Sequence, residues 1–357
     1  MAPFTTPEEL SIAYATLTFT FRTGLTKSLA WRKWQLKQIF WMIYDNEPAI
    51  AAGLHEDLHR HDFESYYADI GSLKTTIFEH LAHVEEWAAD EIPSAGFLFG
   101  TLCKARIRKE PRGVALVIGA WNFPFVLALM PLVAAVSAGC CVLVKPSEVA
   151  AASQELIKKL IEKYLDQRAI RAVTGGPKET MLILEKKFDH VFYTGSPNVG
   201  RIVQVAAAKH MTPNGMRTWC EDCPRWAISL TLIVLELGGQ APAIVTSTAD
   251  IDIAAKRILL SKILNGGQIC LSCNHLIVDP QVHDQSVERV GHWLDQFQKG
   301  EGKGQMSHII NERNYDRVSG LLKATKGKLV HGGELDRETK FIQPAIVTDV
   351  TLQGGSC

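Results

Sequence analysis

The sequence has no excess of charge of either sign. Among its 357 residues there are 38 Lys plus Arg and 38 Asp plus Glu, so the formal net charge is zero. A strongly basic surface field, which would draw the chain to nucleic acid, is therefore not expected. The balance excludes the simplest class of nucleic-acid-binding protein, and we expect no nucleic-acid partner.

The N-terminus also lacks the features of a secretory signal, a basic start followed by an apolar segment and a small-residue cleavage site. The chain contains eight cysteines, and without a signal they suggest a reducing compartment, so a cytoplasmic location is expected. Two Cys-x-x-Cys pairs begin at Cys220 and Cys270. They lie much further apart than the roughly 15–20 residues usual between the pairs of a zinc ribbon, and we predict no metal site.

Charged residues are missing from a long run, Gly113–Val144. A bilayer is spanned by about 20 apolar residues, so the run is long enough to cross one. However, Asn122-Phe-Pro and Pro131 interrupt it. We interpret the run as two strands buried on both faces of a parallel sheet, with a packed helix between them.

Strand and helix patterns alternate from Pro111 onwards. The expected strands are 114–118, 141–145, 170–173 and 190–193, and the expected helices are 125–138, 151–164, 178–185 and 197–209. This order predicts a doubly wound α/β domain that binds ligands at the carboxyl ends of its strands. No Gly-x-Gly-x-x-Gly motif is present, but Gly195-Ser-Pro-Asn-Val-Gly200 opens a helix directly after a strand, where backbone N–H groups favour phosphate.

Two further regions flank this domain. Residues 16–91 are predicted to be helical, with apolar stripes that include Trp31, Trp34 and Leu36. From Leu235 a second α/β group begins. Its expected strands are 243–245, 275–279, 328–330 and 345–347, and its expected helices are 250–264 and 282–297.

A thiol and a carboxylate stand in glycine-rich surroundings in the second half of the chain. Cys270 ends the stretch Asn265-Gly-Gly-Gln-Ile-Cys, and Glu236 lies in Leu-Glu-Leu-Gly-Gly. Such a pair suits covalent attack by sulfur followed by hydrolysis, and Asn122 in Gly-Ala-Trp-Asn-Phe-Pro-Phe can supply an amide to an oxyanion. Each residue also has an ordinary interpretation: a small buried apolar side chain, a solvated strand-end carboxylate and the start of a turn.

Taken in their order, these motifs resemble the aldehyde dehydrogenase superfamily, and within it the class 3 or fatty-aldehyde branch as found in fungi. The resemblance extends from about Phe21 to Val350. It includes the stretches Trp31-Arg-Lys-Trp-Gln-Leu, Arg108-Lys-Glu-Pro-Arg-Gly-Val, Lys145-Pro-Ser-Glu and Phe192-Tyr-Thr-Gly-Ser. It implies a Rossmann-like, doubly wound α/β cofactor domain joined to an α/β catalytic domain that is incomplete here.

The resemblance implies a role for each site residue. Cys270 is the expected nucleophile, Glu236 the general base, and Asn122, with the Cys270 backbone N–H, the oxyanion hole. The cofactor is expected to be NAD or NADP. The residues expected to bind it are Trp121, Lys145, Glu148, Gly195, Ser196, Val199, Gly200 and Leu237. The residues alone leave open that Lys145 is a strand-end charge and Glu148 a first-turn acid of the next helix.

The resemblance also implies the domain organisation. An NAD(P)-binding domain is expected over 1–90 and 111–213, a bridging hairpin that contributes to subunit contacts over 91–110, and a catalytic domain over 235–357. Two departures are expected to matter. The segment 214–231 interrupts a matching region, and the chain stops before the catalytic domain and the C-terminal oligomerisation arm of this homodimeric family are complete. Membrane association through a tail beyond Cys357 is left open.

The expected activity is NAD(P)-dependent oxidation of an apolar aldehyde, either a medium- or long-chain fatty aldehyde or an apocarotenoid one, to the carboxylic acid. The reaction would pass through a cysteine thiohemiacetal and a thioester. The alternative is a catalytically inactive, truncated paralogue, or a splice or gene-model product, that binds nucleotide or full-length subunits.

Overall fold

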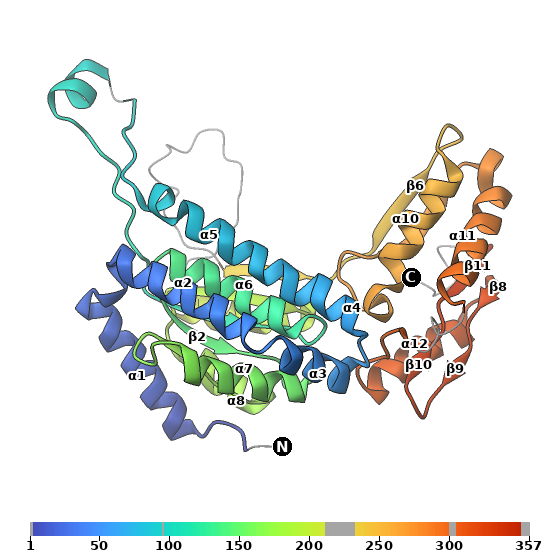
Figure 1. Cartoon of the computed structure of the whole chain (residues 1–357), viewed down its shortest axis with the longest axis horizontal. Helices are drawn as coiled ribbons and strands as arrows, with labels where there is room; N and C mark the ends of the chain where they lie inside the picture. The colour runs from blue at the N-terminus through green and yellow to red at the C-terminus, as the bar shows by residue number, and fades with distance from the viewer. Residues whose placement is uncertain (1–2, 95, 211–232, 300–304, 351–357) are drawn as a thin grey trace. The chain divides into compact units, whose positions relative to one another are not determined.

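The computed structural model describes residues 3–94, 96–210, 233–299 and 305–350, which divide into two compact units (Figure 1). The first unit comprises residues 1–50 and 68–236, and the second comprises residues 51–67 and 237–357. The expected insert at 214–231 and the end of the chain lie outside the described residues.

A five-stranded sheet forms the centre of the first unit, in the order β3-β2-β1-β4-β5. The strands are β1 (Val114–Ile118), β2 (Cys141–Lys145), β3 (Ile170–Ala172), β4 (His190–Gly195) and β5 (Ile233–Leu237). β1 pairs in parallel with β2 and β4, and β2 pairs in parallel with β3. Every residue of β1 and β2 is buried, which confirms that the uncharged run supplies core strands.

Helices cover both faces of this sheet. They are α1 (Pro7–Thr23), α2 (Leu29–Tyr44), α5 (Ser72–Ala88), α6 (Pro124–Ser137), α7 (Ala151–Tyr164), α8 (Pro177–Leu184) and α9 (Pro197–Lys209). Crossovers between parallel strands are right-handed, so α6 and α7 lie on one face, whereas α8 returns the chain to β4 across the other. α2 contacts α5, α6 and α7, and Figure 1 shows α2, α5 and α6 stacked together. The doubly wound fold predicted from the sequence is thereby confirmed.

The apolar stripe of α2 is partly misassigned in the sequence interpretation. Leu36 is fully buried, as expected for a residue that faces the core. Trp31 is half-buried, and its indole Nε1 donates to Asp166 Oδ2 at 3.1 Å. Trp34, expected in the same stripe, is 59% exposed. The prediction for Trp34 was wrong because Trp34 is two residues from the buried Leu36, which places it roughly 200° around the helix, on the side away from the core.

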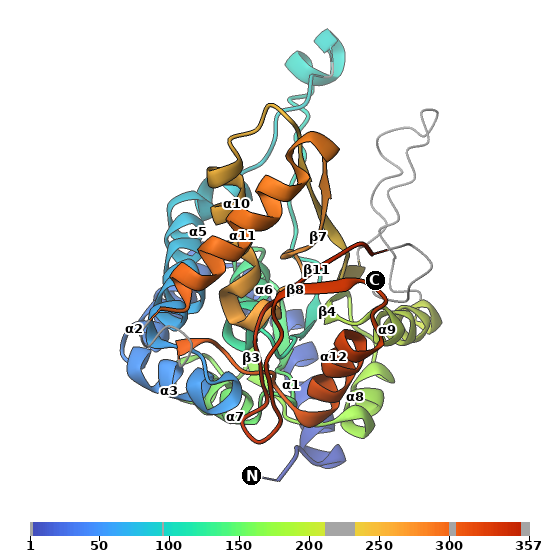
Figure 2. The same ribbon diagram turned by 90° about the vertical axis from the view of Figure 1, so that its right-hand side faces the viewer.

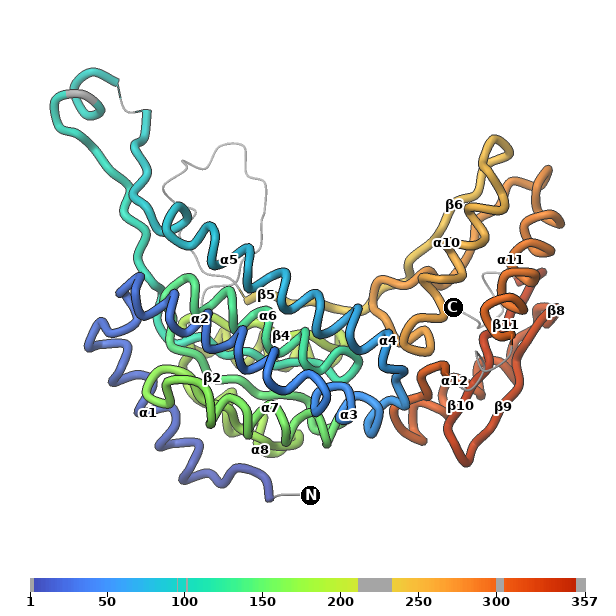
Figure 3. Tube along the Cα trace, viewed as in Figure 1, coloured from blue at the N-terminus to red at the C-terminus, as the bar shows by residue number. Residues whose placement is uncertain are grey.

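An extended arm leaves the first unit between α5 and β1, as the chain trace in Figure 3 shows. Glu91 and Ile107 form an antiparallel bridge at its base. Its outer part is a π-helix, Gly96–Leu102, in which Phe97 and Phe99 are exposed. Residues 91–110, where a bridging hairpin was expected, form this projecting arm, and their role in subunit contacts stays a prediction.

In the second unit, helices α10 (Ile251–Ile263) and α11 (His283–Phe297) lie side by side (Figure 2). Their contact buries Ala255, Leu259, Val290 and Leu294. The strands form three pairs: β6 (Ala241–Val245) with β7 (Cys273–Val278), β8 (Lys328–Gly332) with β11 (Ala345–Thr348), and β9 (Leu335–Asp336) with β10 (Phe341–Ile342). Helix α12 (Glu312–Ala324) and the β9–β10 pair are additional to the expected elements. No helix within the described ranges combines the length and apolar character needed to cross a membrane.

The structure groups residues 51–67 with the second unit, although the sequence interpretation placed them in the first domain. The segment contains most of α3 (Glu47–Leu58) and all of α4 (Asp62–Glu64). The reason is a set of contacts to residues far along the chain, such as the hydrogen bond from His308 N to Leu58 O at 2.8 Å. Helical periodicity carries no information about such long-range contacts.

Candidate active site

The sheet of the first unit reverses its winding between β1 and β4. From β1 the chain moves to β2 and β3 on one side, and α8 then returns it to β4 on the other side. The register pairs Ile118 with both Lys145 and Tyr193, so the carboxyl ends of β1, β2 and β4 lie at one edge. Open α/β sheets bind ligands at such a switch point. The predicted cofactor residues of the first unit follow these three strand ends.

Lys145, the last residue of β2, is only 3% exposed and forms an ion pair with Glu148. A solvated strand-end lysine does not agree with this burial, because a buried ammonium needs a charged or polar partner. Glu148 precedes α7, which begins at Ala151 and has no acidic residue in its first turn. Glu148 is therefore not a first-turn acid of α7, whereas Lys145 is a strand-end charge that is buried and paired; their binding of a cofactor stays a prediction.

The Gly195–Gly200 motif forms the junction of β4 and α9. Ser196 is the N-cap of α9, and its Oγ accepts a hydrogen bond from the Val199 N–H at 3.4 Å. Ser196 and Val199 are exposed, whereas Gly200 is buried. The N-terminal amides and the positive end of this helix therefore face outward at the edge where phosphate binding was predicted.

Asn122 and Glu236 also belong to the first unit. Asn122 is buried in the turn between β1 and α6, next to the half-buried Trp121. Phe123, and not Asn122, is the N-cap of α6, so Asn122 does not serve to cap that helix. Glu236 is the penultimate residue of β5 and is exposed, as is Leu237 after it.

Cys270 is an exposed residue that closely follows an unusual turn in the second unit. The turn, Leu264–Gly267, ends α10, and Asn265, Gly266 and Gly267 have φ angles of 52°, 59° and 76°. A left-handed asparagine stores about 1–3 kcal/mol and persists where its surroundings hold it, which is common at functional sites. Gly266 is required here, because a Cβ would lie 2.7 Å from the backbone oxygen of Ser307.

Two residues that the sequence analysis missed contact this turn. Arg60 Nη2 donates to Asn265 Oδ1 at 2.7 Å, and Asn265 N donates to Glu64 Oε2 at 3.0 Å. Burial raises the pKa of the Glu64 carboxyl, although the Asn265 N–H and Arg60 act in the opposite direction. An isolated arginine in an amphipathic segment has no sequence motif.

Cys273 differs from Cys270 in its surroundings. It is the first residue of β7 and is half-buried, and its Sγ lies 3.5 Å from His275 O. Burial raises the pKa of the Cys273 thiol, which lowers the fraction of reactive thiolate. The sequence interpretation of Cys273 as a structural residue agrees with this environment.

The predicted catalytic residues are thus divided between the units. Asn122 and Glu236 lie in the first unit and Cys270 in the second, which also contains Leu237, a predicted cofactor-binding residue. Within the first unit, Lys145 and Glu148 lie at the end of β2 and the start of α9 follows β4, the two strands that flank β1. The convergence of Cys270 with Asn122 and Glu236 stays a prediction.

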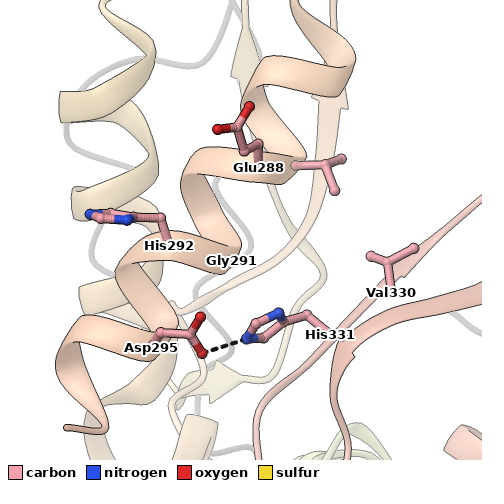
Figure 4. Close-up of a pocket in the computed structure, with 7 residues that line it drawn as sticks. Glu288, Gly291, His292, Asp295, Val330 and His331 are labelled. Carbon is pink, nitrogen blue, oxygen red and sulfur yellow. Dashed lines mark hydrogen bonds and ion pairs between the residues drawn. The ribbon is translucent and has the colours of Figure 1, made fainter.

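An open hollow of about 400 Å³ lies between α11 and β8 in the second unit (Figure 4). Its lining residues are Val287, Glu288, Gly291, His292, Asp295, Val330 and His331. His331 Nε2 and Asp295 Oδ1 are 2.8 Å apart, and Figure 4 shows these two side chains pointing toward one another. None of the lining residues belongs to the predicted site.

Comparison with known proteins agrees with the motifs. The sequence profile of the aldehyde dehydrogenase family matches residues 27–354. A dimeric, NADP-preferring aldehyde dehydrogenase of Rattus norvegicus is 37% identical over 335 residues, which cover 93% of this chain and 69% of the relative. A beta-apo-4'-carotenal oxygenase of Neurospora crassa is 35% identical over 351 residues, covering 97% of this chain and 62% of the relative.

Solved structures share the fold. The substrate-bound AldH of Staphylococcus aureus matches with a TM-score of 0.86 and 30% sequence identity, over 96% of this chain and 71% of that one. The glyceraldehyde-3-phosphate dehydrogenase GapN of Methanocaldococcus jannaschii, complexed with NADP, matches with a TM-score of 0.77 at 21% identity. The chain spans between about three fifths and seven tenths of the length of these relatives. On the profile match and the shared fold together, the chain belongs to the aldehyde dehydrogenase family.

Proposed function

We propose that this chain oxidises an apolar aldehyde to the carboxylic acid, with NAD or NADP as the hydride acceptor. The observation that carries the proposal is the exposed Cys270 beside a left-handed glycine turn, in a family member that also has Asn122 and Glu236 in their motifs. Medium- or long-chain fatty aldehydes and apocarotenoid aldehydes are the proposed substrates. A carotenal oxygenase among the relatives supports the second class.

The first unit has the groups that a dinucleotide needs. The outward N-terminus of α9, capped by Ser196, suits a pyrophosphate. Glu148, which holds the buried Lys145, can accept hydrogen bonds from ribose hydroxyls. When bound, the nicotinamide would supply the acceptor for a hydride. These residues do not discriminate NAD from NADP.

The chain's own residues provide the remaining chemistry. The Cys270 thiolate adds to the aldehyde carbon, and the oxyanion receives hydrogen bonds from the Asn122 amide and the Cys270 N–H. Departure of the hydride leaves a thioester on Sγ. Glu236 takes a proton from water, the resulting hydroxide attacks the thioester, and the acid and the Cys270 thiolate are released.

The proposal is tested by following reduced nicotinamide at 340 nm with the whole chain, NAD or NADP, and decanal or an apocarotenal. Sustained formation of reduced cofactor together with the acid supports it. A folded chain that binds NAD but forms no product would contradict it and would favour the alternative, an inactive nucleotide-binding protein.

Replacing Asn122 with alanine should lower kcat by roughly 10²–10³-fold, because one oxyanion donor is lost. The KM for the cofactor should change little, since Asn122 is assigned to the oxyanion. Steady-state kinetics with both substrates measure the two effects. Gln285→Ala, which removes an exposed side-chain amide on α11, is the control. An unchanged kcat in Asn122→Ala would remove this residue from the oxyanion hole.

The arm supports a second proposal, that a further copy of this chain covers it. Ile92, Phe97, Leu98, Phe99 and Leu102 are between 58% and 73% exposed. An exposed apolar cluster of this kind marks an interaction surface, and a relative is described as dimeric.

The double change Phe97→Ser and Phe99→Ser should therefore weaken self-association at least about tenfold, because buried aromatic residues dominate interface energies. Sedimentation analysis over a range of concentrations measures the dissociation constant. Phe19→Ser changes an equally exposed phenylalanine on α1 and serves as the control. Equal association of all three proteins would show that the arm is not the interface.

A further inference from the structure

We infer that Arg60 and Glu64 are positioning residues that hold the turn carrying Cys270. The inference rests on the proposed role of Cys270 and extends it to a segment with no catalytic motif. Both residues come from the segment 51–67, and the turn comprises residues 264–267, with Gln268 directly after it. All of these residues belong to the second unit.

Asn265 is the residue of the turn to which the segment 51–67 forms hydrogen bonds. Its side-chain oxygen accepts from Arg60, its backbone N–H donates to Glu64, and its Nδ2 donates to Gln268 O at 3.2 Å. Asn265 is 1% exposed and left-handed. Arg60 therefore holds the side chain of Asn265, and Glu64 holds its backbone, at the position where the chain adopts the left-handed conformation.

Burial makes these contacts unusual. Arg60 is fully buried, and Glu64 is mostly shielded from water. Burying a guanidinium and a carboxylate is costly unless both are hydrogen-bonded, so removal of either partner leaves the other group buried without compensation. Glu64 also accepts from Ser307 Oγ at 3.4 Å, which ties a third segment to the same carboxylate.

A second set of hydrogen bonds continues from the turn toward the nucleophile. Gln268 Nε2 donates to the backbone oxygens of Asn265 and His308, at 3.0 and 2.9 Å, and Gln268 Oε1 accepts from Ile310 N at 3.0 Å. His308 N in turn donates to Leu58 O. Arg60 and Glu64 thus bind the turn directly at Asn265, and Leu58 supports Gln268 through His308. Cys270 lies two residues after Gln268.

By holding the turn, Arg60 and Glu64 limit the orientations of the Cys270 thiol and backbone N–H. With the left-handed turn held at two points, few conformations are open to residues 269 and 270. Without Arg60 or Glu64, the strain at Asn265 favours relaxation of the turn toward other backbone conformations. The proposed mechanism needs the thiol and the N–H within a fraction of an ångström of their reactive positions, so relaxation lowers turnover and not cofactor binding.

The test uses the whole chain with Arg60→Met, which keeps length without charge, and Glu64→Met, which keeps length without the carboxylate that accepts from Asn265 and Ser307. Arg60→Lys is the rescue variant because it restores a cationic donor. Arg289→Met is the matched control, since Arg289 is an arginine of the same unit that pairs with Asp252 between α10 and α11. Amide hydrogen exchange is measured on peptides covering 264–270 and 283–297, and kcat and KM are measured in parallel.

We expect Arg60→Met and Glu64→Met to accelerate exchange in 264–270 at least about tenfold while 283–297 is unchanged. We also expect kcat to fall at least tenfold with an unchanged KM for the cofactor, and Arg60→Lys to recover part of both losses. Unchanged exchange in 264–270, or equal acceleration in both peptides, would overturn the inference. A similar loss of kcat in Arg289→Met would also overturn it.

The two proposals fail separately. If the unsubstituted chain does not turn over aldehyde, the proposed function fails, whereas hydrogen exchange still decides whether Arg60 and Glu64 hold the turn. If Arg60→Met does not fold, Glu64→Met, at a residue that is less buried than Arg60, carries the exchange and kinetic measurements alone.

Discussion

Replacing Cys270 with alanine is expected to abolish aldehyde-dependent formation of reduced nicotinamide, with a loss of about 10³-fold or more. The sulfur is the atom that the proposed reaction joins to the substrate, and removal of a nucleophile typically leaves only residual binding and oxyanion effects. Binding of NAD, followed by fluorescence titration, should be unchanged, because the proposed cofactor edge belongs to the first unit.

Cys273→Ala is the matched control for this result. The two thiols lie in one short stretch, but Cys273 is half-buried and begins β7, whereas Cys270 is exposed. We expect Cys273→Ala to keep most of the turnover, with a modest loss of stability from the missing packing. Turnover retained in Cys270→Ala and lost in Cys273→Ala would reassign the nucleophile.

Glu236→Gln is expected to separate the two halves of the reaction. Without a base to activate water, the thioester accumulates, so about one equivalent of reduced nicotinamide per active site should form in a burst. Steady-state turnover should then fall by roughly 10²–10⁴-fold, the usual contribution of general base catalysis. Rapid mixing with absorbance detection at 340 nm measures the burst and the slow phase.

The control for this change is Glu185→Gln, which neutralises an exposed carboxylate at the end of α8 in the same unit. It should retain full steady-state turnover. Loss of the burst itself in Glu236→Gln would show that Glu236 acts before hydride transfer, and the assignment as the base for hydrolysis would be wrong.

The doubly wound sheet could be predicted because its central strands carry a strong signal. β1 and β2 are buried on both faces, so they appear in the sequence as uncharged apolar runs bounded by helix patterns. Helix α12 was missed because it buries little of its surface, with Tyr315 and Ser319 its buried residues. A capping signal at Asn311, whose side chain accepts from Asn314 N, could have located its start.

The site could be predicted as motifs but not as contacts. Lys145 and Glu148 lie three residues apart, and their ion pair is local enough to follow from the sequence. Arg60 and Asn265 are more than 200 positions apart in the chain, and no periodicity or motif spacing in the sequence predicts the hydrogen bond between them. The burial of Arg60 and its hydrogen bond to the turn are visible only in the three-dimensional structure.

The most direct measurement is mass spectrometry of the Glu236→Gln chain after incubation with NAD and decanal. The proposed mechanism predicts a decanoyl group on the peptide that contains Cys270, in an amount equal to the burst of reduced nicotinamide, and none in a chain that also carries Cys270→Ala. Reduced nicotinamide formed without an acyl group on Cys270 would contradict the covalent mechanism.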